Sequence, residues 1–81
     1  MKQAEIEIGK SYSNGHPVGS RYRTVRKVLE IVYGRAPLGE SEGWNVRYLC
    51  LEGTRDVKGR EGIITLQAFA SWAKEVVEEG V

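Results

Sequence analysis

Residues 44–51, with the sequence WNVRYLCL, decide the fold. Apolar and polar side chains alternate along this stretch, and alternate positions of an extended chain lie on opposite faces of a sheet. One face carries Trp44, Val46, Tyr48 and Cys50, whereas the other face becomes apolar only toward its end. The pattern predicts a β-strand whose aromatic-rich face is turned to a core.

The segment that follows is predicted to return as a second strand and then to form a helix. Residues 52–62 (EGTRDVKGREG) are polar and predict a hairpin connection into a strand that contains Ile63 and Ile64 and ends about Thr65. A helix over residues 66–79 is expected next, with Thr65 as N-cap and Gly80 as its stop. One apolar stripe at helical spacing supports it: Leu66, Phe69, Ala70, Ala73, Val76 and Val77.

Residues 21–33 (RYRTVRKVLEIVY) are compatible with two structures. The spacing of Tyr22, Val25, Val28, Leu29 and Val32 permits a helix. The many β-branched residues favour a strand, because their restricted χ1 angles suit a pleated surface. We expect a long, bent strand with a bulge near residues 25–28, where the alternation slips.

The remaining segments predict one short strand and two loops. Ile6 and Ile8 alternate with glutamates, which indicates a half-buried strand or strand-like entry. The sequence SNG at residues 13–15 predicts a turn, and residues 34–43 (GRAPLGESEG) predict an exposed loop.

The 81 residues are enough for a single domain, residues 1–81. Glycines separate short β-rich runs, which is typical of small all-β folds. We expect a mainly β fold, an SH3-like antiparallel barrel of four to five strands closed by one C-terminal helix. A β-sheet with one helix packed across a face is the second choice.

Composition favours a cytoplasmic protein. The chain has a single cysteine, Cys50, so it forms no intramolecular disulfide, and small secreted domains usually depend on such bonds. The first ten residues lack the apolar run of a signal peptide, and no stretch of 18 apolar residues is present.

Candidate catalytic groups are too few to predict an enzyme. A lone His16 and a lone Cys50 fall short of a zinc site, so we expect no metal and no cofactor. Gly9-Lys10-Ser11 resembles the end of a phosphate-binding loop, but Ala4 stands where the motif requires glycine. The carboxylate pairs Glu40/Glu42 and Glu78/Glu79 lie in a predicted loop and at a predicted helix end, where solvation keeps their acidity ordinary.

Charge is the feature that points to a partner. The net charge is only +1, yet residues 10–60 hold ten Lys and Arg against five Asp and Glu. Tyrosines and Trp44 are interleaved with these arginines, a combination that can bind peptides or stack bases. The alternative is that the charges simply occupy solvated strand positions. Candidate partner- or nucleic-acid-binding residues are Arg21, Arg23, Arg47, Arg55, Lys58 and Arg60.

Four segments resemble an uncharacterised family of small proteins encoded in phage and prophage genomes: IEIGKSYSNG, YRTVRKVLEI, WNVRYLCL and GIITLQAFASWAKEVVE. The shared positions are Gly9 and Tyr12, 22–25, 46–48 and 66–73. The resemblance implies a phage accessory protein with a small barrel, located in the cytoplasm of a bacterial host, and it implies no catalytic activity.

We therefore expect a non-enzymatic binding module for a protein partner, a host factor or a component of a host defence system. The alternative is a nucleic-acid-binding module that uses the basic middle segment. No membrane interaction is expected, and the chain is expected to be a monomer or a homodimer, since a small sheet has unpaired edges.

Overall fold

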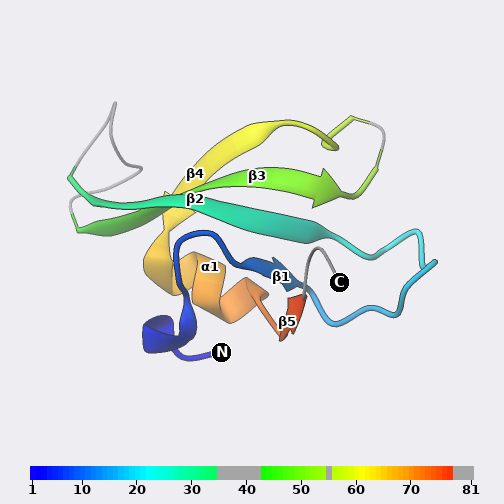
Figure 1. Cartoon of the computed structure of the whole chain (residues 1–81), viewed down its shortest axis with the longest axis horizontal. Coiled ribbons are helices and arrows are strands. Elements are labelled where there is room, and N and C mark those ends of the chain that lie inside the picture. Colours follow the sequence, from blue (N-terminus) through cyan, green and yellow to red (C-terminus); the bar gives the residue numbers. More distant parts are fainter. Residues whose placement is uncertain (35–42, 55, 78–81) are drawn as a thin grey trace.

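The computed structural model describes residues 1–34, 43–54 and 56–77. It contains one antiparallel sheet of five strands in the order β4-β3-β2-β1-β5, with one short α-helix against it (Figure 1). The strands are β1 (Ser11–Ser13), β2 (Val25–Tyr33), β3 (Trp44–Glu52), β4 (Glu61–Thr65) and β5 (Glu75–Val77). The helices are the 3-10 turn η1 (Gln3–Glu5) and α1 (Leu66–Trp72).

The mainly β fold is confirmed, including the strand at residues 44–51 and its returning partner. The ambiguous segment forms the long strand β2, which begins at Val25. Its pairing with β3 shifts register at Val25/Arg26 and again at Val28/Glu30. The second shift turns Glu30 toward Arg47 and pairs Ile31 with Val46. The irregularity thus keeps a glutamate out of the core and places an isoleucine against it.

The sheet is open, and β4 and β5 are its two edges. The chain passes from one edge strand to the other through α1, so the helix lies across the side where a barrel would close (Figure 1). The expected barrel closure is therefore not seen among the described residues.

The predicted helix over residues 66–79 is wrong in length. Thr65 caps its N-terminus as expected, because the Thr65 hydroxyl oxygen accepts a hydrogen bond from the Ala68 amide at 3.1 Å. The helix ends at Trp72, and the Lys74 amide donates instead to the Ser13 carbonyl. Residues 75–77 then pair with β1. The β-branched Val76 and Val77 fit the helical stripe in the sequence, but here they pair with the edge of β1 that β2 does not occupy. Gly80, the expected stop, lies outside the described residues.

The strand expected at Ile6 and Ile8 is also wrong. Ile6 is buried beside η1, whereas Ile8 lies in a turn and is 63% exposed. The first strand is β1, and the Gly9 amide bonds to the Val28 carbonyl just before it. Burial of Ile6 in the core cluster with Phe69 and Ala70 therefore decides the local conformation, although the alternation of Ile6 and Ile8 with glutamates predicts a strand.

The core lies between the inner face of the sheet and α1. Phe69 is fully buried at its centre, with Tyr12 edge-on at 5.7 Å between ring centroids, Tyr48 at 6.0 Å and Trp72 at 5.3 Å. The buried cluster consists of Ile6, Tyr12, Val28, Val46, Phe69, Ala70 and Ala73.

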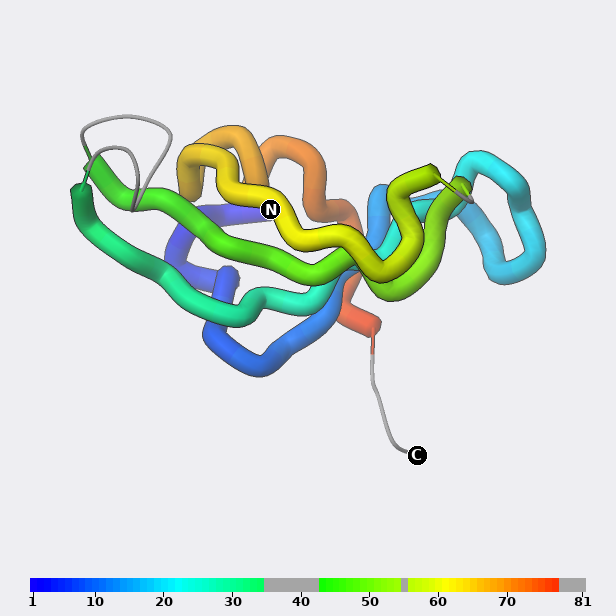
Figure 2. The backbone as a smooth tube through the Cα atoms, turned by 90° about the horizontal axis from the view of Figure 1, so that it is seen from above, coloured from blue at the N-terminus to red at the C-terminus, as the bar shows by residue number. Residues whose placement is uncertain are grey.

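The loops gather at the two ends of the long strands. The β1–β2 loop and the β3–β4 loop lie side by side at one end (Figures 1 and 2). At the other end β2 and β3 approach the predicted 34–43 loop, of which residues 35–42 lie outside the described part. None of the helices described is long and apolar enough to cross a membrane.

Candidate functional site

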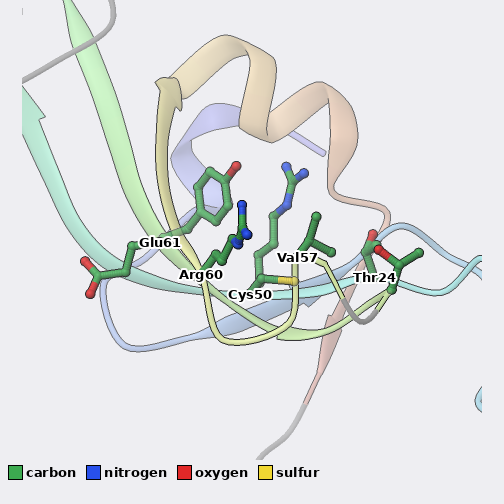
Figure 3. Close-up of a pocket in the computed structure, with 8 residues that line it drawn as sticks. Thr24, Cys50, Val57, Arg60 and Glu61 are labelled. Atoms are coloured by element: carbon green, nitrogen blue, oxygen red, sulfur yellow. The ribbon is translucent and has the colours of Figure 1, made fainter.

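A pocket of about 430 Å³ opens where the inner face of the sheet meets the β3–β4 loop (Figure 3). Pockets of this size accommodate a side chain or a small molecule. Strands β2, β3 and β4 and the two neighbouring loops contribute its lining residues, which are Thr24, Arg26, Tyr48, Cys50, Thr54, Val57, Arg60 and Glu61.

Strand register brings these residues together. Arg26 is the cross-strand partner of Cys50, and Val28 is the partner of Tyr48, so Arg26, Tyr48 and Cys50 share the inner face. The β3–β4 loop is tied to β3 beside them, since the Cys50 amide donates to the Arg60 carbonyl and the Gly59 amide donates to the Cys50 carbonyl. Gly59 has a φ of 84°, a conformation that glycine adopts without the steric penalty of a side chain.

Arg26 is the central cation of the pocket. Its guanidinium carbon lies 4.5 Å from the centre of the Tyr48 ring and 4.4 Å from that of Trp72. Two aromatic rings thus hold the group by cation–π attraction and restrict its motion. In the described part of the chain no carboxylate forms an ion pair with Arg26. Its planar set of N–H donors thus has no carboxylate partner among the residues that the structure describes.

Arg60 adds a second cation, which immediately precedes β4 and is exposed. Its neighbour Glu61 does not neutralise it, because the Glu61 carboxylate accepts from Arg47 at 2.5 Å and points away from the other labelled residues (Figure 3). Among the described residues Arg60, too, forms no ion pair.

The wall of the pocket combines polar and apolar groups. The Thr24 Oγ1 atom is buried and has no hydrogen-bond partner among the described residues. Val57 and the buried Cys50 supply apolar surface, and the Cys50 thiol is directed to the Glu52 carbonyl at 3.3 Å.

This arrangement suits binding. Two cations and aromatic surface match a ligand that has an anionic head and an apolar body. Within residues 1–34, 43–54 and 56–77 no group of three His, Cys, Asp or Glu side chains is placed to hold a metal ion.

The six predicted binding residues differ in their surroundings, and two of them form ion pairs within the chain. Arg23 is only 7% exposed, and it contacts Glu52 at 3.5 Å and Glu75 at 3.2 Å, so its role is structural. Arg47 lies on the outer face between Glu30 and Glu61, each at 2.5 Å. Carboxylates of the same chain thus already pair with both arginines, and their role in partner binding stays a prediction.

The other four predicted residues have different placements. Arg21 lies on the β1–β2 loop with its guanidinium 5.0 Å from the Tyr22 ring centre. Lys58 is exposed on the β3–β4 loop, and Arg60 lines the pocket. Arg55 lies outside the described residues. The carboxylate pairs Glu40/Glu42 and Glu78/Glu79 also lie outside them.

Sequence reasoning missed Arg26 and Trp72. Arg26 was one basic residue among many in a segment whose structure was ambiguous. The alternation in WNVRYLCL did place Tyr48 and Cys50 on one face. Only the pairing of β2 with β3 shows that Arg26 shares that face.

Comparison of the chain with protein-family models, curated proteins and solved structures finds no match. The functional argument therefore depends on the geometry of the site.

Proposed function

We propose that this chain is a non-enzymatic binding module that recognises an acidic group of a protein partner in the Arg26 pocket. The likeness of its sequence to phage and prophage proteins supports an accessory role directed at a host protein. An SH3-like architecture is part of the proposal, and the helical link between the two edge strands of an antiparallel sheet supports it.

The observation that carries the proposal is the environment of Arg26. A guanidinium between two aromatic rings is partly desolvated, and electrostatic interactions are stronger there than in bulk water. A carboxylate that enters the pocket can accept two parallel N–H bonds from Arg26, with Arg60 at the rim. A protein partner is favoured over nucleic acid because Arg23 and Arg47, part of the expected basic surface, are already paired.

The test is an NMR titration of ¹⁵N-labelled protein with a short acetylated, glutamate-rich peptide and with its glutamine counterpart. We expect the Arg26 Nε–Hε resonance to shift and saturate with the acidic peptide only. Arg26→Lys keeps the charge but loses the planar fork, so its affinity should fall about tenfold. Arg21→Lys makes the same substitution on a loop residue outside the pocket and should bind as the wild type does.

Two outcomes contradict the proposal. Equal binding of the acidic and neutral peptides shows that no anion is recognised, and unchanged affinity in Arg26→Lys shows that the anion binds elsewhere. A parallel titration with short single-stranded DNA addresses the alternative. Binding to DNA without binding to the peptide, with an affinity that falls steeply as salt rises, assigns the chain to nucleic acid.

A further inference from the structure

Strand β4 presents main-chain hydrogen-bonding groups at an edge of the sheet. The bond from the Cys50 amide to the Arg60 carbonyl defines a hydrogen-bonded position of the β3–β4 ladder. Bonded and non-bonded positions alternate in an antiparallel pair, so Gly62 and Ile64 bond to β3. The amides and carbonyls of Glu61 and Ile63 therefore point away from β3, toward the open side.

This edge lacks the features that usually prevent further pairing. In the described part of the chain β4 has β3 as its only strand neighbour. Exposed edges are commonly blocked by proline, by lysine or by a bulge within the strand. The sequence of β4 is EGIIT, which contains no proline or lysine and is rich in β-branched residues. Its ladder with β3 is regular from Thr65 to Glu61.

The charge around β4 indicates what kind of strand fits there. Arg60 and the exposed Lys58 precede it, whereas the Glu61 carboxylate pairs with Arg47, which Glu30 shares. Arg60 and Glu61 also line the Arg26 pocket, so the edge and the pocket are continuous. A strand added along β4 passes the pocket mouth, and its alternate side chains can enter that mouth.

We infer that β4 is a docking edge for an extended, acidic segment of a partner protein, which adds a sixth strand to the sheet. Main-chain hydrogen bonds to Glu61 and Ile63 hold the segment, and an acidic side chain binds in the Arg26 pocket. The acidic specificity rests on the proposed function, whereas the strand pairing is a separate property with its own readout.

The test combines amide hydrogen exchange with calorimetry, using a short acetylated peptide of alternating valine and glutamate. Exchange at the Ile63 amide should slow about tenfold on saturation, as one new main-chain hydrogen bond predicts. Ile63→Pro removes that outward N–H and leaves the ladder to β3 intact, so affinity should fall at least about tenfold. Ile63→Val keeps both the N–H and the branched side chain and should bind normally.

The outcomes separate this inference from the proposed function. If the peptide shifts the Arg26 Nε–Hε resonance but leaves exchange of the Ile63 amide unchanged, the strand-addition inference is wrong. The proposed binding of an acidic group in the pocket is then still supported. If a valine–glutamine peptide protects Ile63 equally well, the edge binds strands and the acidic recognition is wrong. Protection of the Ile63 amide that rises with protein concentration in the absence of peptide assigns the edge to a second copy of this chain and overturns a partner segment. The exchange measurement on wild-type protein decides the matter even if Ile63→Pro does not fold.

Discussion

The Nη1 atom of Arg23 lies 3.2 Å from the Oε1 atom of Glu75 and joins residues that are 52 positions apart in the sequence. The same nitrogen donates to the His16 carbonyl at 2.8 Å. Arg23 therefore ties β5 to the β1–β2 loop, at the point where the chain leaves the helix and joins the sheet. A buried arginine with several charge-assisted bonds is a structural element, whatever partner the protein has.

Replacement of Arg23 by glutamine should destabilise the fold. The variant loses charge-assisted hydrogen bonds at a position that is 7% exposed, and we expect a loss of about 1.5–3 kcal/mol in the free energy of unfolding. Urea denaturation measures it. Arg21→Gln, on the exposed neighbour two positions earlier, should change stability little, and an equal loss in both variants would argue against the special role of Arg23.

Stability should depend on pH through Glu75. The Ser13 hydroxyl donates to its carboxylate at 2.6 Å, and together with Arg23 this bond lowers the pKa of Glu75 below its ordinary value of 4.5. A group with a lowered pKa in the folded state stabilises that state above the unfolded pKa. This contribution is lost as pH falls below 4.5 and through the folded pKa. Thermal unfolding between neutral and acidic pH should show a shallower dependence in Glu75→Gln, and identical slopes in the two proteins would contradict the prediction.

Removal of the Phe69 ring should be among the most costly substitutions. Phe69 is fully buried and contacts three other aromatic rings across the sheet and helix. Phe69→Ala should cost about 3–5 kcal/mol, because the cavity it leaves is lined by large side chains that collapse only partly. Val18→Ala, at a position that is 85% exposed, is the control for loss of apolar atoms without a cavity. A Phe69→Ala protein as stable as Val18→Ala would show that this ring is not central to the core.

Gly62→Ala should alter the pocket through Tyr48. A Cβ atom at Gly62 would lie 2.6 Å from the Tyr48 hydroxyl oxygen and 2.7 Å from Cζ, which is closer than real contacts allow. The Tyr48 ring must therefore move, and Arg26 loses one of its two aromatic neighbours. We expect shifts of the Tyr48 ring resonances and of Arg26 Nε–Hε, with weaker binding of the acidic peptide. Unchanged Tyr48 resonances would mean that the backbone moves instead.

The helix N-cap offers a further test. The Thr65 hydroxyl satisfies the Ala68 amide at the first turn of a helix of only seven residues. Thr65→Ala should cost about 1 kcal/mol, and Thr65→Ser should retain most of the stability because it keeps the acceptor oxygen. Denaturant unfolding of the two variants checks this, and equal losses would show that the methyl group, rather than the cap, is what matters.

Local patterns were sufficient to predict most of the strands. The alternation in WNVRYLCL, the β-branched residues of 25–33 and the polar hairpin at 52–62 each act over a few residues, so β2, β3 and β4 could be predicted from the sequence. The Thr65 cap could be predicted for the same reason, since its hydrogen bond spans three residues. A mainly β fold with a helix after β4 was therefore determined by the sequence alone.

Tertiary contacts decided the rest. Residues 75–77 fit a helical stripe in sequence, but they pair with β1, more than 60 positions earlier, along the edge that β2 leaves open. The candidate site also depends on contacts between residues that are far apart in the sequence. Arg26 contacts Tyr48 and Trp72 only through strand register and helix packing. Arginines 23 and 26 are close in sequence, yet one is neutralised by carboxylates and the other is held between rings. Long-range packing, which a local pattern does not encode, determines which charge remains available to a ligand.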